Sequence, residues 1–287
     1  MEKFVAFFLM IANIISGGTV SDNGTFQCFE NNSNQSQQQT ELFEKERTGV
    51  LTADFSGVSN KGSGWGFVKN KGKAPDIYQS TQDLFRNYNT FYVDPKQSKT
   101  IYLTFDEGYE NGHTAVILDV LKEHDVKAAF FVTGPYLEKE TLLVERMINE
   151  GHIVGNHTVN HPNLHKLSDP RKMADELEQL NRRFFEKYGK NMKYMRPPEG
   201  EYSERVLAVA NNLGYKTIFW SFAYKDWDVN SQKGADYAFN QVTPYLHDGA
   251  IILLHAVSKD NAESLGRIIT YAKEQGYVFG TLDELSY

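Results

Sequence analysis

The stretch TIYLTFDEG, residues 100–108, decides the fold of this chain. Its first six residues are apolar, aromatic or β-branched, which is typical of a buried strand. Two acidic residues, Asp106 and Glu107, follow where that strand is expected to end, and Gly108 lets the chain turn sharply there. In barrels of parallel strands this end of the strand carries the chemistry. The stretch therefore predicts a catalytic edge, although either acid could simply cap the following helix.

Segments typical of strands and of helices alternate after this stretch. Strands are predicted at residues 128–133, 153–154, 193–195, 217–220, 250–254 and 277–279, and helices near 114–122, 137–149, 169–188, 204–213, 237–246 and 262–274. Ser168, Ser203 and Asn261 are the expected N-caps of three of these helices. Alternation of this kind favours parallel pairing through right-handed crossovers. We therefore expect an α/β fold, a distorted (β/α)7 barrel with an N-terminal extension packed on it. An open doubly wound sheet is the alternative.

The chain before residue 99 differs in composition from the rest. Residues 1–20 hold a lone basic residue and a short apolar run, the pattern of a signal peptide or an uncleaved N-terminal anchor. Residues 21–60 are rich in Asn, Ser, Gln and Thr, which predicts a low-complexity linker. Residues 61–98 regain aromatic side chains and are expected to form an N-terminal strap on a catalytic domain of residues 99–287. This organisation predicts an extracytoplasmic protein, secreted or membrane-anchored.

Composition excludes several classes of partner. The chain has 287 residues, 40% of them hydrophobic, which is enough for a sizeable core. Its formal net charge is -7 and it has no long basic block, so nucleic acid is not expected as a partner. A membrane is expected only through the N-terminal segment. Cys28 is the single cysteine and cannot form an internal disulfide. We expect a monomer with a neutral or mixed-charge partner.

Polar side chains recur where the predicted strands end. They are His157 and His161 after residues 153–154, Arg196 after 193–195, Asp226 and Trp227 after 217–220, and His255 after 250–254. The carboxyl ends of parallel strands in a barrel meet at one mouth. The sequence therefore predicts that these residues and Asp106 form a single site.

The two histidines suggest a metal site. A spacing of four residues places both imidazoles on one side of a helical turn, which suits a divalent metal, although His157 and His161 could also be a chance surface pair. A carboxylate from another strand would complete a ligand set with an open position for water. That arrangement is typical of hydrolytic zinc sites.

The other polar residues suggest acid–base chemistry and sugar binding. Two prolines after Arg196 indicate a rigid placement, or they simply end the strand. His255 could be an ordinary core histidine, but a carboxylate such as Asp226 can orient an imidazole and favour its protonated form, which makes it a general acid. Trp227 offers a flat face for a sugar ring, with core packing as the alternative.

These motifs resemble the polysaccharide deacetylase superfamily, the carbohydrate esterases with the NodB homology domain. The resemblance covers about residues 98–279 and rests on TFDEG at 104–108, HTVNH at 157–161, RPPEG at 196–200, DW at 226–227 and LLH at 253–255. It implies that Asp106 is the general base, held by Arg196, and that His255 is the general acid, oriented by Asp226. It implies that Glu107, His157 and His161 bind a divalent metal, zinc first, with cobalt or manganese as alternatives. Contacts with the substrate are expected from Trp227, Pro198, Glu199 and Tyr109.

Two positions depart from the family pattern. The family has Asp where this chain has the longer Glu107, and it has an acid where this chain has Ala223. A branch with a residue other than Asp at the first position comprises the N-acetylmuramic acid deacetylases of spore-forming bacteria. The chain resembles that branch in WGFVKN at 65–70, DEGYENG at 106–112 and HAVSKDN at 255–261.

The branch implies a substrate and a product. The expected reaction is de-N-acetylation of N-acetylmuramic acid in peptide-free peptidoglycan strands, leading to the muramic δ-lactam of spore cortex. One alternative is a deacetylase of N-acetylglucosamine in chitin-like or vegetative glycans, and another is a catalytically inactive glycan-binding module. A glycosidase that pairs Asp106 with Asp226 is a weaker alternative, because it leaves His157 and His161 unexplained.

Overall fold

The computed structural model describes residues 53–96 and 98–287. The predicted signal peptide or anchor at residues 1–20 and most of the predicted linker at 21–60 lie outside the described residues. Within the described part, no helix is both long enough and apolar enough to cross a bilayer.

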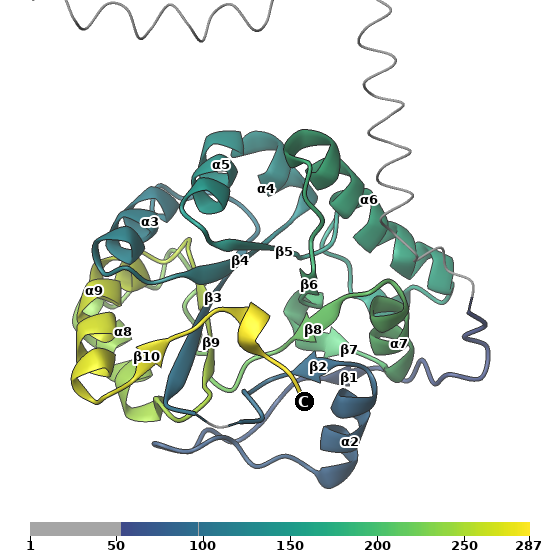
Figure 1. Ribbon diagram of the computed structural model, residues 1–287, viewed down its shortest axis with the longest axis horizontal. Coiled ribbons are helices and arrows are strands. Elements are labelled where there is room, and N and C mark those ends of the chain that lie inside the picture. The colour runs from purple at the N-terminus through teal and green to yellow at the C-terminus, as the bar shows by residue number, and fades with distance from the viewer. Residues whose placement is uncertain (1–52, 97) are drawn as a thin grey trace, which may run out of the picture. The chain divides into compact units, whose positions relative to one another are not determined.

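Parallel strands form the centre of the fold (Figure 1). Their bounds are β2 Thr90–Phe91, β3 Thr100–Glu107, β4 Ala128–Val132, β5 Ile153–Asn156, β6 Tyr194–Met195, β8 Lys216–Ile218, β9 Ile251–His255 and β10 Val278–Phe279. They follow the order β10-β3-β4-β5-β6-β8-β2, and β9 also pairs with β3. A separate antiparallel pair joins β1, Ser63–Gly64, to β7, Glu201–Tyr202.

Helices surround these strands in Figure 1. Their bounds are α2 Gln79–Asn87, α3 Thr114–Glu123, α4 Gly134–Lys139, α5 Thr141–Asn149, α6 Pro170–Tyr188, α7 Glu204–Asn212, α8 Ala235–Val242 and α9 Lys259–Glu274. Short 3-10 helices are η1 Leu164–Lys166, η2 Pro198–Gly200, η3 Thr243–Tyr245 and η4 Leu282–Glu284.

The sheet closes into a barrel through the segment after β8. There the Ser221 amide donates to the Ile251 carbonyl at 2.9 Å, and the Leu253 amide donates to the Phe222 carbonyl at 2.9 Å. Because β9 is paired along its other edge with β3, these bonds complete the ring. The distorted (β/α)7 barrel is confirmed, and the open sheet is excluded.

The period-2 alternation of β3 separates two apolar layers. Tyr102 packs inside the barrel with Phe131, whereas Leu103 and Phe105 pack outside it, against the helices. Burial of each such side chain contributes about 1.5–3 kcal/mol. The same alternation points Asp106 into the barrel and Glu107 toward the helices.

Helix starts depart from the predictions at two of three N-caps. Ser203 caps α7 as predicted, accepting from the Val206 amide. The N-cap of α6 is Asp169 and not Ser168, because the Asp169 carboxylate accepts from the Arg171 amide. Pro170 follows Asp169 as the first residue of the helix, a position that favours proline. The N-cap of α9 is Ser258, so Asn261 lies inside the helix.

Other element boundaries differ as well. The helix predicted at 137–149 is two helices, α4 and α5, separated at Glu140, whose φ of -104° and ψ of 42° are not helical. The predicted seventh strand, β10, pairs only with the first residues of β3. The residues predicted as a strap contribute β2, which joins the central sheet beside β8.

Candidate active site

Asp106 and Arg196 form a buried ion pair at the mouth of the barrel. Arg196 is completely buried, and its Nη1 donates to Asp106 Oδ1 at 2.7 Å. Its Nη2 donates to Thr104 Oγ1 at 2.8 Å, and its Nε donates to the Ile218 carbonyl at 2.9 Å. The guanidinium also stacks 4.3 Å from the centre of the Phe131 ring. These contacts set Arg196 in one position, and Arg196 in turn orients Asp106.

The charge environment keeps Asp106 ionised. Burial by itself raises the pKa of a carboxyl group, but the charge of Arg196 above all, with the charge of His255 and the hydrogen bond from Arg196, lowers the pKa of Asp106 below its ordinary value. One carboxylate oxygen is engaged by Arg196, and the other faces His157. Asp106 is therefore suited to accept a proton from water.

His157 is a neutral imidazole with a defined tautomer. Its Nδ1 lies 2.8 Å from the Arg196 carbonyl, which can only accept, so Nδ1 carries the proton. Its Nε2 lies 3.6 Å from Asp106 Oδ2. Burial lowers the pKa of His157 to about 4, although Asp106 opposes this. The unprotonated Nε2 therefore faces the site.

His161 is brought beside His157 by a loop and not by a helical turn. The five residues 157–161 follow β5 without helical structure, and Thr158 and His161 have positive φ angles of 68° and 55°. The His161 ring is exposed and meets the His157 ring edge-on, with centroids 4.8 Å apart. The loop thus achieves the proximity that the spacing predicted.

Glu107 does not join the histidines. Because β3 continues to Glu107 and does not end at Phe105, the Glu107 side chain lies on the helix side of the sheet. It is completely buried, and neither of its oxygens has a hydrogen-bond partner. Burial, with the charges of Glu110 and Asp106, raises the pKa of Glu107 well above its ordinary value.

The predicted metal ligands are therefore not assembled as a set. Among the described residues, no three His, Cys, Asp or Glu side chains are grouped so that they could hold a metal ion. His157 and His161 lie together, and Glu107 stays apart. Ligands to a divalent metal must be deprotonated, which an acid with a raised pKa resists.

Asp226 and His255 form the second charged pair. His255 Nδ1 lies 2.7 Å from Asp226 Oδ1, and the His255 amide donates to Asp226 Oδ2 at 2.8 Å. Burial by itself lowers the pKa of His255, but the charge and the hydrogen bond of Asp226 outweigh it, so the pKa of His255 is raised. His255 is thereby suited to donate a proton near neutral pH.

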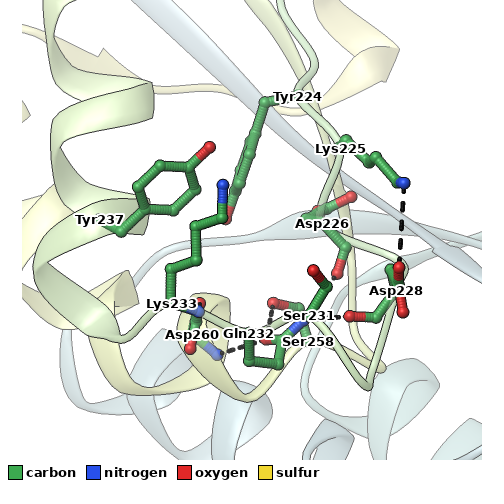
Figure 2. Close-up of a pocket in the computed structure, with 10 residues that line it drawn as sticks. All are labelled: Tyr224, Lys225, Asp226, Asp228, Ser231, Gln232, Lys233, Tyr237, Ser258 and Asp260. Carbon is green, nitrogen blue, oxygen red and sulfur yellow. Dashed lines mark hydrogen bonds and ion pairs between the residues drawn. The ribbon is translucent and has the colours of Figure 1, made fainter.

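The loop that carries Asp226 is tied to the start of α9. Gln232 Nε2 donates to the Asp226 carbonyl at 3.2 Å, and its Oε1 accepts from Ser258 Oγ at 2.8 Å and from the Asp260 amide at 3.1 Å. Figure 2 shows these residues around a pocket of about 160 Å³. Gln232 was not predicted from the sequence, because no motif surrounds it.

Four residues were expected to contact substrate. Trp227 is 51% exposed, and its ring meets His255 edge-on at 5.4 Å, so it is not core packing. Tyr109 is 54% exposed, and Glu199 is exposed at a positive φ of 60°. Pro198 is buried, so it shapes the loop and offers no surface. Trp227, Tyr109 and Glu199 are thus open to a ligand.

The fold and the site together define a class of protein. A parallel barrel that holds an ionised carboxylate and a protonatable imidazole at the carboxyl ends of its strands is the architecture of an enzyme that uses general acid–base catalysis. Asp226 is 3% exposed, and both of its oxygens already accept hydrogen bonds, so it cannot flank a sugar as a glycosidase carboxylate.

Comparisons with known proteins specify this class. Residues 94–218 match the family model described as polysaccharide deacetylase. The peptidoglycan-N-acetylmuramic acid deacetylase PdaA of Bacillus subtilis is 45% identical over 238 residues, 82% of this chain and 90% of PdaA. A peptidoglycan-N-acetylglucosamine deacetylase of Bacillus cereus is 34% identical over 203 residues, 69% of this chain and 92% of that protein.

A solved structure agrees. The solved structure of Bacillus subtilis PdaA, described as a family 4 carbohydrate esterase, matches this structure with a TM-score of 0.77. The match covers 79% of this chain and 98% of the PdaA chain. The chain therefore belongs to the polysaccharide deacetylase family, carbohydrate esterase family 4, and is a hydrolase that acts on amide bonds.

Proposed function

We propose that this protein removes the acetyl group from N-acetylmuramic acid residues in peptidoglycan strands that have lost their stem peptides. The observation that carries the proposal is the pairing of base and acid. Asp106 and His255 are register partners on neighbouring strands β3 and β9, each held by a buried partner of opposite charge. A base and an acid side by side can act on the two sides of one amide bond.

The reaction needs two proton transfers. Asp106 accepts a proton from water as the water oxygen attacks the acetamide carbonyl, and His255 protonates the nitrogen as the C–N bond breaks. One water is consumed, and acetate and a free amine are released. A backbone N–H in the loop after Arg196 is proposed to hold the oxyanion.

Metal dependence is a further part of the proposed function. The family resemblance predicts a divalent metal, most simply zinc, with cobalt or manganese as substitutes. Because the described residues do not assemble the predicted ligand set, no step above depends on a metal.

The choice of sugar is supported by the relatives. The protein named as an N-acetylmuramic acid deacetylase is 45% identical over 82% of this chain, against 34% over 69% for the one named for N-acetylglucosamine. After deacetylation, the amine can condense with the lactyl carboxylate of the same sugar and release water, which gives the muramic δ-lactam. We propose the spore cortex as the place of this product, an extracytoplasmic location and a monomeric state.

Acetate release from defined glycan strands tests the proposal. Wild type should release acetate from peptide-free strands and much less from strands that carry stem peptides. Asp106→Asn should reduce the rate by about 100-fold or more. A chelator followed by zinc, cobalt or manganese measures the metal requirement in the same assay.

The alternatives predict other outcomes. Acetate release from chitin-like oligomers in preference to peptide-free peptidoglycan would indicate that the substrates are N-acetylglucosamine glycans. Glycan binding without acetate release, whichever metal is added, would indicate a binding module and not an enzyme.

A further inference from the structure

Asn261 is a buried residue that the proposed reaction does not use. It lies in the first turn of α9 and is 1% exposed. Its Nδ2 donates to Asp226 Oδ2 at 2.6 Å and to the His255 carbonyl at 3.2 Å. Its Oδ1 accepts from the Tyr224 hydroxyl at 2.5 Å. All polar atoms of this side chain are thus engaged by groups in or next to the Asp226–His255 pair.

The Asn261 amide has one favourable orientation. Its nitrogen faces a carboxylate and a carbonyl, which only accept, and its oxygen faces a hydroxyl that donates. Burial, with the charges of Asp226 and Asp260, raises the pKa of Tyr224, so the hydroxyl keeps its proton. A flipped amide would place oxygen against oxygen. Tyr224 therefore orients Asn261, and Asn261 orients Asp226.

The bond from Asn261 changes how Asp226 acts on His255. Asp226 is 3% exposed, so little water competes for its oxygens. Oδ1 accepts from the His255 ring, and Oδ2 accepts from the His255 amide and from Asn261. A donor on a carboxylate draws charge from it and weakens it as a partner for a cation. The donor from Asn261 therefore limits how firmly Asp226 holds the imidazolium.

We propose that Asn261, held by Tyr224, is a positioning residue for the general acid: it sets the orientation of Asp226 and keeps His255 able to release its proton. The proposal rests on the proposed function, in which His255 protonates the leaving amine. The charged groups around His255 are Asp226 from the loop after β8, Asp106 from β3 and Arg196 after β6. Asn261 approaches the pair from α9 as a neutral donor.

The test measures the His255 ring directly in the full chain. Histidines are labelled with carbon-13 and titrated by NMR, and His255→Gln assigns the signal. Asn261→Leu, which keeps the branched shape of the side chain and removes the donors, should raise the pKa of His255 by about half a unit to one unit. Tyr224→Phe should raise it less. The matched control is Tyr194→Phe, which loses a partly buried hydroxyl bond to Asp283 and should leave the pKa of His255 unchanged.

The outcomes separate a positioning role from a structural one. An unchanged or lowered pKa of His255 in Asn261→Leu would overturn the proposal, because packing alone predicts no upward shift. If that variant does not fold, Tyr224→Phe decides by the same criterion. The titration needs no substrate. An upward shift in a protein that releases no acetate would support the positioning role and overturn only the proposed function.

Discussion

At the residue scale, the neighbouring residues Asp106 and Glu107 have side chains in opposite environments. Asp106 points into the barrel and receives the Arg196 cation, so it is ionised. Glu107 points to the helix side, where it is completely buried and unpartnered. An unpaired buried charge is costly, so burial favours the neutral form of Glu107 and raises its pKa. The acid that the family pattern assigns to a metal is here buried in the core.

Replacing Glu107 by glutamine should stabilise the protein at neutral pH. The pKa of Glu107 is raised in the folded state, so the unfolded chain releases this proton at a lower pH than the folded one. The stability of the wild type therefore declines as pH rises above the ordinary value of 4.5, and glutamine removes this decline. We expect Glu107→Gln to exceed the wild type by at least about 1 kcal/mol at pH 8, and by less at pH 5.

Urea unfolding at both pH values measures this difference. Glu145→Gln, at an exposed position on α5, is the control and should show no such pH dependence. Equal gaps between Glu107→Gln and wild type at pH 5 and pH 8 would contradict the assignment of a neutral Glu107.

Removing the charge of Asp226 should change the pH dependence of activity. Asp226 raises the pKa of His255, and His255 must be protonated to act as an acid. Asp226→Asn should therefore lower that pKa and bring the alkaline loss of activity to a lower pH, with a fall in kcat/KM of about 10² to 10⁴. The measurement is kcat/KM between pH 5.5 and 9. Asp228→Asn, next to Lys225, is the control; a loss by the same factor at every pH would argue against His255 as the acid.

At the scale of elements, the loop between β8 and α8 gains its shape from α9. It carries Asp226 and Trp227. Gln232 links it to the start of α9, because its amide nitrogen donates to the Asp226 carbonyl and its amide oxygen accepts from Ser258 and Asp260. The Lys233 amide adds a further bond to Asp260 Oδ2 at 2.6 Å. Loop and helix therefore hold Asp226 as one unit.

Loss of this link should lower activity more than stability. Gln232→Leu removes the bonds that place the Asp226 backbone, so we expect kcat/KM to fall by about tenfold, since small misplacements of reacting groups are costly. Thermal unfolding should shift by only a few degrees. Gln79→Leu, which removes an exposed bond to Asp83 on α2, is the control and should leave kcat/KM unchanged. Intact kcat/KM in Gln232→Leu would show that the loop holds its shape without the link.

At the scale of the whole molecule, residues 53–96 contribute to the barrel and pack against it. They supply β2 to the central sheet, and Trp65 packs against Phe85 and Phe219 at 5.2 and 5.3 Å. The Trp65 indole donates to the Trp220 carbonyl at 2.9 Å, and its amide donates to the Gly200 carbonyl at 2.9 Å. The N-terminal segment thus supports the loop that follows Arg196.

Truncation of Trp65 should weaken both fold and site. Trp65→Ala removes a half-buried ring, so we expect a loss of about 2–3 kcal/mol in the free energy of unfolding. KM should rise as the 196–200 loop loses support. Trp65→Phe keeps most of the ring and should lose less in both measurements. Unchanged stability in Trp65→Ala would show that this segment is an appendage of the barrel.

Much of the site followed from local patterns. Strand signals that end in polar residues predicted that Asp106, Arg196, Asp226 and His255 would meet, and the structure confirms it. The orientation of Glu107 was missed because it depends on whether β3 ends two residues earlier. Asn261 was interpreted as a helix cap. Its contact with Asp226 was missed, because the two residues lie 35 positions apart in the sequence.

Period-2 alternation, turn residues and strand ends are properties of neighbouring residues, so the amino-acid order was enough to predict the parallel barrel and the edge where its chemistry lies. Barrel closure through Phe222, the inclusion of β2 and the linkage of Asn261 to Asp226 depend on contacts between distant segments. Whether a carboxyl group is charged also depends on such contacts, because burial and nearby cations decide its pKa. Tertiary structure alone therefore decided that Asp106 is paired with a buried cation and that Glu107 is buried without one.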